Sequence, residues 1–491
     1  MENNKNNKSY IAILTMVIAL ALILRYFKAD TMNLWLDEAF GYWLSLQPLS
    51  NILKYIYNMD AHPPLFYFFL HFWVKAGHNP LTLRLPGIIL GSLSLIGVYL
   101  LGKELINKQA GLIAAFMTAV SVSCVMMSRE IRMYVYLSFF IIFAFYFFVK
   151  LFDRREVPES EYNPKPIYWF LYMICMVASW YLHYLGIFVS VSHNIIVALF
   201  YRRINIRHWI LSQLIILICY IPWYKYLFYQ IFCSRGPQEA TFGWNAILYI
   251  WDLLFSSSML LYPDKYNMWF VFIISALCLL ILILSIVNYR KDRFFLAVVF
   301  IGFYTPFLIL YFKSLLTSQT IFQLRYFNYA LPLYFLIVVS SFVTKKKINT
   351  FLAFIIIGSF LVFNAAGLYN KYYVKGFQVQ RWTEAVEYLQ EHYNSNDAII
   401  IQSSFQAMPF NYYFRQKHTE YYLTGKDVPE LKGILAKHGR IWMVMSFAWQ
   451  SDSENRIAKW LYENCEWEAV RYKNFTQSDA DIIVILFTPK K

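Results

Sequence analysis

The sequence has few of the features that mark disulfide-rich, metal-binding or repeat proteins. It contains six cysteines in 491 residues and no CxxC pair, so nothing indicates a disulfide framework or a thiolate metal site. The 17 glycines and 16 prolines form no long flexible linker, and no internal repeat is visible. The fold therefore has to be explained by hydrophobic burial rather than by covalent or metal cross-links.

Apolar residues dominate what is present. Hydrophobic residues make up 59% of the chain and aromatic residues 20%, and the mean hydropathy is +0.43. A soluble domain of this composition would expose too much apolar surface, which predicts a polytopic membrane protein. The formal net charge is +15, but the basic residues sit in short clusters between apolar runs. That pattern is an orientation signal of membrane proteins, so we expect no nucleic-acid partner.

Eleven apolar segments approach the roughly 20 residues that a crossing helix needs. When the basic clusters are placed in the cytoplasm, these segments alternate without conflict, with a cytoplasmic N-terminus and an external C-terminal region. The first segment follows basic residues without a small-residue cleavage site, which predicts an uncleaved span. The predicted spans are 10–28, 82–101, 110–127, 132–150, 167–183, 186–200, 208–228, 268–288, 294–312, 326–343 and 349–369.

One short apolar run, residues 65–74, would invert every later loop if it crossed the membrane. We therefore predict that it forms a helix lying in the outer interface, where Tyr and Trp are favoured. Residues 29–81 then form one long external loop with at least two membrane-lying helices. A second aromatic-rich external loop is predicted at 229–267.

The composition changes near residue 376. Residues 381–392 have a helical period, and short apolar runs at Ala398–Gln402, Ile441–Ser446 and Ile482–Phe487 are typical of buried strands. The sequence therefore predicts a transmembrane catalytic domain at 1–375. A small extracytoplasmic α/β domain is predicted at 376–491.

Polar and charged residues that are energetically costly near lipid fall on the external side of this predicted topology. Ionised groups placed there are either solvated by a polar cavity or take part in chemistry. Because the topology was set by other loops, their shared face suggests one external cavity. The groups are Asp37 and Glu38 after the first span, Asp60 and His62 before the interfacial helix, Arg129, Glu130, Arg132 and Tyr134 between spans three and four, His183 at the end of span five, and Arg325 and Tyr326 at the start of span ten.

Each of these groups also has a purely structural explanation. Asp37 could accept hydrogen bonds at the start of a helix that begins at Glu38. His62-Pro63-Pro64 could be only the rigid start of a helix. Anchoring at the membrane interface would account for the others: Arg129 and Arg132 with Glu130 as their partner, His183, and Arg325.

Three segments resemble the GT-C superfamily of integral-membrane glycosyltransferases. They are Trp35-Leu-Asp37-Glu38-Ala, His62-Pro63-Pro64-Leu-Phe-Tyr67 and Ser128-Arg-Glu130-Ile-Arg132-Met-Tyr134. The resemblance is strongest to the bacterial branch related to protein O-mannosyltransferases (glycosyltransferase family 39) and lipid A aminoarabinose transferases. Arg325-Tyr326 followed by Pro332, and His183 with flanking tyrosines, resemble further elements of that group.

The resemblance implies an inverting enzyme of the bacterial inner membrane. Such enzymes move a sugar from a polyprenyl-phosphate lipid to an acceptor hydroxyl or phosphate on a glycolipid, polysaccharide or protein at the outer face. It implies catalytic roles for Asp37, as the general base, and for Glu38 and Glu130. It implies substrate binding by His62, Arg129, Arg132, Tyr134, His183, Arg325 and Tyr326, since forked guanidinium donors suit a phosphate.

The sequence leaves the cofactor and two competing functions open. A divalent metal ion would help to neutralise the phosphate, but arginines could replace it, so no metal site is assigned. A lipid or sugar transporter would need charged or broken helices near the bilayer midplane. An O-antigen ligase or polymerase would transfer a whole oligosaccharide and resembles this chain less, because it lacks the Asp-Glu loop after the first span.

Overall fold

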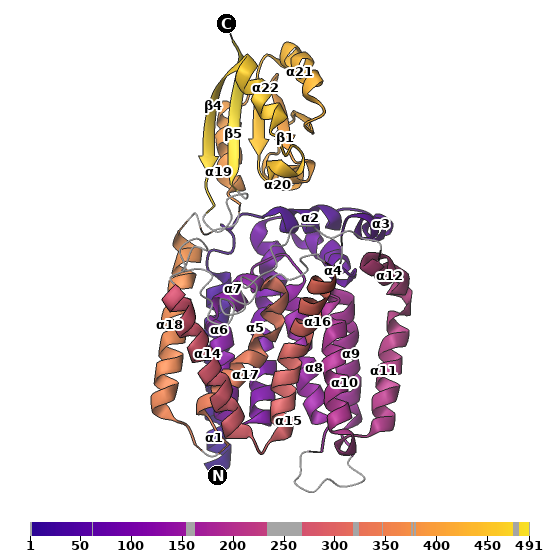
Figure 1. Ribbon diagram of the computed structural model, residues 1–491, viewed down its shortest axis with the longest axis vertical. Coiled ribbons are helices and arrows are strands. Elements are labelled where there is room, and N and C mark those ends of the chain that lie inside the picture. Colours follow the sequence, from indigo (N-terminus) through magenta and orange to yellow (C-terminus); the bar gives the residue numbers. More distant parts are fainter. Residues whose placement is uncertain are drawn as a thin grey trace. The chain divides into compact units, whose positions relative to one another are not determined.

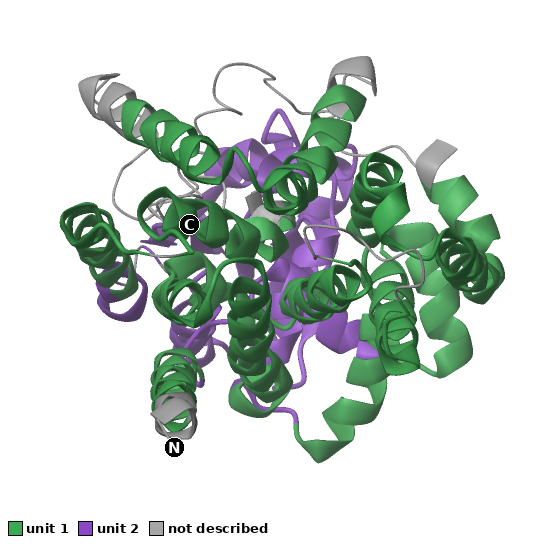
Figure 2. Cartoon of the chain, turned by 90° about the horizontal axis from the view of Figure 1, so that it is seen from below, with its two compact units in different colours: residues 1–29, 47–77, 81–368 green, residues 30–46, 78–80, 369–491 purple. Residues whose placement is uncertain are grey.

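The structure is a computed structural model (Figure 1), and it describes residues 2–60, 62–153, 163–232, 268–317, 324–345, 347–374, 377, 380–474 and 481–490. The chain forms two compact units (Figure 2). Unit 1 comprises residues 1–29, 47–77 and 81–368, and unit 2 comprises 30–46, 78–80 and 369–491. The division at 375/376 stays a prediction. Unit 2 contains a segment, 30–46, that the sequence analysis had assigned to the transmembrane part.

Unit 1 is built from apolar helices that run alongside one another (Figure 1). Every predicted span coincides with one of these helices or with a consecutive pair of them. The helices are α1 (Glu2–Tyr26), α5 (Pro80–Leu105), α6 (Lys108–Val120), α7 (Val122–Ser128), α8 (Tyr134–Lys150), α9 (Pro166–Leu182), α10 (Leu185–Leu199), α11 (Ile206–Tyr220), α12 (Tyr224–Phe232), α14 (Met268–Tyr289), α15 (Arg293–Leu296), α16 (Gly302–Thr317), α17 (Leu331–Phe342) and α18 (Thr350–Tyr373).

The helix lengths support a multi-pass membrane protein. Within the described residues, five helical stretches are long and apolar enough to cross a membrane, and α6 with α7, bent by 63°, would make a sixth. The remaining predicted spans correspond to shorter apolar helices of 10–17 residues. The polytopic helical fold is thus confirmed, whereas the count of eleven spans stays a prediction. The predicted loop 229–267 lies mostly outside the described residues.

A buried arginine stabilises the break between α6 and α7. The Arg25 guanidinium donates to the carbonyls of Ala119 at 3.0 Å and Thr118 at 3.4 Å, and its Nε donates to the Ser128 hydroxyl at 3.1 Å. Carbonyls at a helix C-terminus carry partial negative charge and lack partners within the helix. Arg25, which is 1% exposed, therefore satisfies the end of α6 and fixes the end of α7.

Small residues on α5 allow the end of α7 to pack closely against it. A Cβ atom at Gly91 would lie 2.2 Å from the Ser128 hydroxyl, and one at Gly87 would lie 2.8 Å from the Ser128 carbonyl. A larger residue at Gly87 would have to displace the backbone at Ser128, and one at Gly91 would have to displace the Ser128 side chain. This contact sets the starting point of the loop that carries Arg129, Glu130 and Arg132.

The first loop contains three helices, of which α3 (Leu49–Met59) and α4 (Leu65–Trp73) belong to unit 1. Within unit 1 they lie at the upper end of the bundle in Figure 1. Helix α4 begins where the interfacial helix was predicted and continues into a 3-10 turn at Val74–Ala76. Its position in a membrane stays a prediction.

Unit 2 contains a five-stranded sheet with the strand order β2-β1-β3-β5-β4. Strand β1 pairs in parallel with β2 and β3, whereas β5 is antiparallel to β3 and β4. The three predicted strands are present, and the predicted α/β fold is confirmed. The strands are β1 (Ala398–Gln402), β2 (Thr419–Tyr421), β3 (Ile441–Met445), β4 (Cys465–Tyr472) and β5 (Ile482–Pro489); the helices are α2 (Leu36–Ser45), α19 (Trp382–His392), α20 (Ala407–Tyr413), α21 (Leu431–His438) and α22 (Arg456–Asn464).

Helices cover both faces of this sheet. Ile399 and Ile401 of β1 pack into one apolar core with residues of α19 and α20, while Ala398 and Ile400 face a second core with α21 and α22. A strand covered on both faces reads as a continuous apolar run, which is why β1 could be predicted to the residue. Strand β4 is exposed over most of its length and β2 has only three residues, so neither shows such a run.

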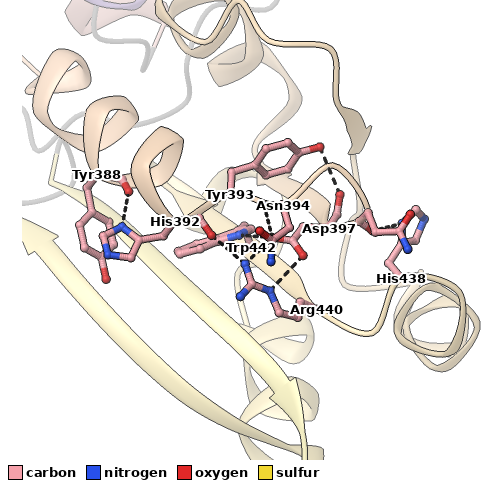
Figure 3. Close-up of polar contacts among 9 residues, drawn as sticks. Tyr388, His392, Tyr393, Asn394, Asp397, His438, Arg440 and Trp442 are labelled. Carbon is pink, nitrogen blue, oxygen red and sulfur yellow. Dashed lines mark hydrogen bonds and ion pairs between the residues drawn. The ribbon is translucent and has the colours of Figure 1, made fainter.

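A buried carboxylate links the beginnings of strands β1 and β3 by hydrogen bonds (Figure 3). Asp397, just before β1, accepts from Arg440 Nε at 3.0 Å and Nη2 at 2.6 Å, and from Trp442 Nε1 at 2.9 Å. The backbone N–H of Asn394 donates to it at 2.9 Å. Burial alone would raise the pKa of Asp397, but these donors hold it below its usual value.

We expect Asp397→Asn to destabilise unit 2 by about 2–4 kcal/mol, because it leaves Arg440 without its buried charge partner. A carboxylate whose folded pKa is depressed contributes stability above its unfolded pKa of about 4, and that contribution is lost as the pH falls through the folded pKa. The cost of the substitution should therefore shrink below about pH 4. Hydrogen exchange of the β1 and β3 amides measures it. Glu391→Gln, at an exposed position of α19, is the control, and equal exchange in the two variants would contradict the prediction.

Candidate active site

The connection between α3 and α4 places the predicted His-Pro-Pro segment in the interior of unit 1. Asp60 ends α3 in an extended conformation, and His62, Pro63 and Pro64 are all buried before α4 begins at Leu65. Proline restricts both its own backbone and that of the preceding residue. The segment therefore forms a rigid start of α4, which agrees with the structural explanation given for His62-Pro63-Pro64.

Asp60 is the centre of a polar network in this corner. Its Oδ1 lies 2.7 Å from His62 Nδ1, and its Oδ2 accepts from the Tyr67 hydroxyl. Arg132 Nη1 in turn donates to the Tyr67 oxygen at 3.2 Å. Burial by itself would raise the pKa of Asp60, but His62, Arg132 and Tyr67 outweigh it and lower that pKa well below the usual value. Asp60 is thus an ionised carboxylate that accepts a hydrogen bond from the Nδ1–H group of His62. The other ring nitrogen, Nε2, then carries a lone pair in the neutral ring.

Gln230 of α12 joins the network from a distant part of the chain. Its Nε2 donates to the carbonyl of Asp60 at 2.8 Å and to that of Ile56 at 3.3 Å, and both carbonyls lie at the end of α3. Its Oε1 accepts from the Tyr184 hydroxyl, which also accepts from Trp223 Nε1 at 3.1 Å. The sequence analysis missed Gln230. Its burial is visible only in the structure, and the sequence shows no more than one polar residue within an aromatic segment.

Four loops bring aromatic and histidine rings together. The His62 and His183 rings lie 5.0 Å apart, and the His183 and Tyr326 rings 5.1 Å apart, both edge to face. Tyr134 lies 5.9 Å from His183 and 6.0 Å from Tyr326, and the Arg132 guanidinium lies 6.0 Å from the Tyr134 ring centre. These five residues, His62, Arg132, Tyr134, His183 and Tyr326, are called the ring cluster below.

His183 has a defined orientation. It ends α9 in an extended conformation, and its Nδ1 accepts from the backbone N–H of Leu185 at 3.1 Å. A ring nitrogen that accepts carries no proton, so the neutral ring bears its proton on Nε2. The proton-bearing Nε2 atom of His183 is buried, and Asp60 favours the opposite tautomer at His62.

The two arginines of the α7–α8 loop differ in their surroundings. Arg129 is 1% exposed, and its Nη2 donates to the carbonyl of Lys28 at 2.7 Å. Arg132 instead contacts Tyr67 and Tyr134 within the ring cluster. Glu130 lies between them and is half-buried. The structure thus brings Arg132 to the other predicted binding residues and places Arg129 against the chain that follows α1.

Arg325 and Tyr326 lie on the 3-10 helix η7 (Leu324–Ala330). Tyr326 belongs to the ring cluster, while the side chain of Arg325 lies outside the described residues. The predicted phosphate-binding role of Arg325 stays a prediction.

Asp37 and Glu38 lie in unit 2, in the first turn of α2. Glu38 is 1% exposed, and its Oε2 accepts from the backbone N–H of Trp35 at 3.4 Å. The helix begins at Leu36, two residues earlier than the capping explanation of Asp37 required, and Glu38 is the acid that binds the helix start. Asp37 is half-buried.

Metal binding finds no direct support. Among the residues that the structure describes, no group of three or more His, Cys, Asp or Glu side chains is arranged to hold a metal ion. A divalent ion stays open, as it does in the sequence.

Removal of the Asp60 charge should destabilise unit 1. Asp60→Asn keeps the shape of the side chain but leaves Arg132 and His62 without a carboxylate, at a cost of about 2–4 kcal/mol. We expect a melting temperature several degrees lower in detergent solution. The exposed Asp30→Asn substitution is the control, and identical unfolding of the two variants would show that Asp60 does not hold the corner together.

Part of the chain matches a known family model. Residues 61–226, which include four of the five ring-cluster residues, match the family model described as dolichyl-phosphate-mannose-protein mannosyltransferase. No curated protein matches the sequence. The matched segment is about a third of the chain.

Solved structures extend the similarity to nearly the whole chain. ArnT from Cupriavidus metallidurans bound to undecaprenyl phosphate is 10% identical, with 96% of this chain and 97% of that chain covered and a TM-score of 0.60. The same protein in the apo state is also 10% identical, with 97% of this chain and 98% of that chain covered and a TM-score of 0.58. The oligosaccharyltransferase of Archaeoglobus fulgidus is 11% identical, covers 94% of this chain and 73% of that chain, and has a TM-score of 0.53. The expected resemblance is confirmed: this multi-pass membrane protein has the fold of the GT-C superfamily of glycosyltransferases.

Proposed function

We propose that the protein is an inverting glycosyltransferase that moves a sugar from a polyprenyl-phosphate donor to an acceptor hydroxyl or phosphate at the outer face of a bacterial inner membrane. The acceptor would be a glycolipid, a polysaccharide or a protein. The observation that carries the proposal is the ring cluster, in which an arginine, two histidines and two tyrosines from four loops meet beside ionised Asp60. The similarity of fold to a protein that binds undecaprenyl phosphate supports a lipid donor.

The ring cluster has the chemistry that a sugar phosphate needs. Arg132 supplies a forked, permanently charged donor, and His183 supplies an N–H donor. Because Asp60 fixes Nδ1 of His62, the Nε2 atom of that ring is directed to a ligand, and it donates to a phosphate oxygen when the ring is protonated. The tyrosine rings offer flat apolar surfaces for a sugar or an isoprenoid unit.

In the proposed reaction the acceptor oxygen attacks the anomeric carbon as its proton passes to Asp37. The bond between that carbon and the phosphate oxygen breaks, and the polyprenyl phosphate leaves with the bonding electrons. Arginines stabilise the developing negative charge, with Arg132 as the first candidate and Arg325 and Arg129 as further ones. Glu38 supports Asp37 by binding the start of α2. Glu130 is proposed to orient an arginine or the acceptor.

Two other functions make different predictions. A lipid or sugar transporter would move its substrate across proteoliposomes without changing it. A ligase or polymerase of the O-antigen type would transfer a whole oligosaccharide. Mass spectrometry of envelope glycans from cells with and without an active copy separates these outcomes, because the proposed enzyme adds the mass of one sugar.

Asp37→Asn should lower the rate of sugar transfer by at least about 100-fold, because the acceptor proton then has no base. Binding of undecaprenyl phosphate to the purified protein should remain. Asp30→Asn, on the same segment and exposed, is the control for general effects on folding. Full activity of the Asp37 variant would remove this residue as the base.

Arg132→Gln should weaken the binding of undecaprenyl phosphate by about tenfold or more, since a charge-assisted hydrogen bond is worth roughly 1.5–3 kcal/mol. Arg132→Lys should recover part of the affinity, because it keeps the charge but not the fork. Arg202→Gln, at an exposed position of the 3-10 helix Tyr201–Arg203, controls for the loss of one positive charge. Unchanged affinity in Arg132→Gln would exclude the ring cluster as the phosphate site.

A further inference from the structure

The start of helix α2 is held by residues that lie more than 340 positions later in the chain. The first N–H groups of a helix have no partners within it. The N–H of Leu36 donates to Gln380 Oε1 at 3.2 Å, and the N–H of Leu34 donates to the Tyr413 hydroxyl oxygen at 2.7 Å. The turn that carries Asp37 and Glu38 is therefore fixed by the C-terminal part of unit 2.

The contact is reciprocal. The Oδ1 of Asn33 accepts from the backbone N–H of Thr383 at 2.8 Å and from the Thr383 hydroxyl. Thr383 lies in the first turn of α19, whose own N–H groups need acceptors as well. Asn33, which precedes α2, thus accepts a hydrogen bond from the first turn of α19. Gln380, which precedes α19, accepts one from the first turn of α2. We call the group Asn33, Leu34, Leu36, Gln380, Thr383 and Tyr413 the reciprocal cap.

Gln380 is itself held rigidly. It is 3% exposed, its Nε2 donates to Ser446 Oγ at 2.8 Å and to Gln406 Oε1 at 3.3 Å, and its Oε1 also accepts from Trp382 Nε1 at 3.2 Å. Ser446 directly follows β3, and Gln406 follows β1 by four residues. The reciprocal cap is therefore anchored at the carboxyl ends of two central parallel strands.

The other end of α2 is held in the same way. The Tyr42 ring packs edge to face against Tyr412 of α20 with ring centres 5.0 Å apart. The Tyr42 hydroxyl lies 3.1 Å from His78 Nδ1, and the Tyr412 hydroxyl donates to the His78 carbonyl at 2.7 Å. Both ends of the helix thus contact the domain, which fixes its direction as well as its position.

We propose that the C-terminal domain positions the catalytic acid pair, with Gln380, Thr383 and Tyr413 as positioning residues for Asp37. This inference rests on the proposed function. It assigns the domain a part in the reaction. The alternatives are that the domain is only a scaffold or that it only binds the acceptor. A base must lie within hydrogen-bond reach of the proton that it takes, and a shift of about 1 Å can cost on the order of 100-fold in rate.

The test uses the full-length protein in detergent or nanodiscs and measures two quantities for each variant. Hydrogen exchange of peptides from residues 31–46 reports on the reciprocal cap. Sugar transfer, resolved into kcat and the KM for the lipid-linked donor, reports on catalysis. Tyr413→Phe removes one acceptor without changing shape, and Tyr421→Phe, which loses a hydroxyl bonded to His438 at 3.0 Å, is the control in the same domain.

We expect exchange over residues 31–46 to be about fivefold faster or more in Tyr413→Phe, the factor that corresponds to about 1 kcal/mol for one lost hydrogen bond. We expect kcat to fall by about tenfold or more while the donor KM changes by less than about twofold. Tyr421→Phe should leave both quantities at the wild-type level. Asn33→Leu should act like Tyr413→Phe, and Asn33→Asp, which keeps the acceptor oxygen, should restore kcat.

Each other outcome has a definite meaning. Unchanged exchange in Tyr413→Phe and Asn33→Leu would show that the reciprocal cap does not hold the segment, and the proposal would fail. Faster exchange with unchanged kcat would make these contacts structural only and would equally overturn it. If the wild-type protein transfers no sugar, the proposed function fails and the positioning role with it, while the exchange data still establish whether the cap exists.

Discussion

Ionised side chains surrounded by apolar helices need partners, and this requirement shapes unit 1. Arg25 binds the carbonyls at the end of α6, Arg84 binds the Ala29 carbonyl at 2.8 Å, and Arg129 binds that of Lys28. Each guanidinium is at most 1% exposed, so breaking one of these contacts would leave a charge in a poorly solvated place. The loops that carry the candidate site are thereby tied to helix ends. Asp60 completes the set, because its charge balances Arg132 through the hydroxyl of Tyr67.

Much of the fold could be predicted from the sequence because it depends on local periodicity. Apolar length located the helices of unit 1, and the doubly covered strand β1 was predicted with its observed ends. Strand β4 was missed because its exposed residues carry no such pattern, and β2 because it is too short. The membership of residues 30–46 in unit 2 was also missed. It depends on hydrogen bonds between residues about 350 positions apart, such as Asn33 and Thr383, and a single sequence contains no trace of them.

The candidate site shows the same limit at the level of side chains. Topology and resemblance together selected the residues that form the ring cluster, because all of them lie at loops predicted on one side of a membrane. Topology and resemblance could not tell which of Arg129 and Arg132 lies in the ring cluster. The two are three residues apart; Arg129 binds a backbone carbonyl, whereas Arg132 binds a tyrosine. Topology and resemblance also gave no role to Asp60, since its importance arises from Tyr67 and Gln230, which look like ordinary aromatic-helix residues in the sequence.

The acid pair of α2 illustrates how neighbouring residues of one type acquire different roles. Successive residues on a helix point about 100° apart, so the side chains of Asp37 and Glu38 leave α2 in different directions. Glu38 has the longer side chain, turns back to the Trp35 N–H and is buried. Negative charge is favourable in the first turn of a helix, so this arrangement stabilises α2. Asp37, shorter and half-buried, is left on the more open face. A carboxylate that takes a proton from an acceptor must be reachable by it, which is why Asp37, rather than Glu38, is the base that we propose.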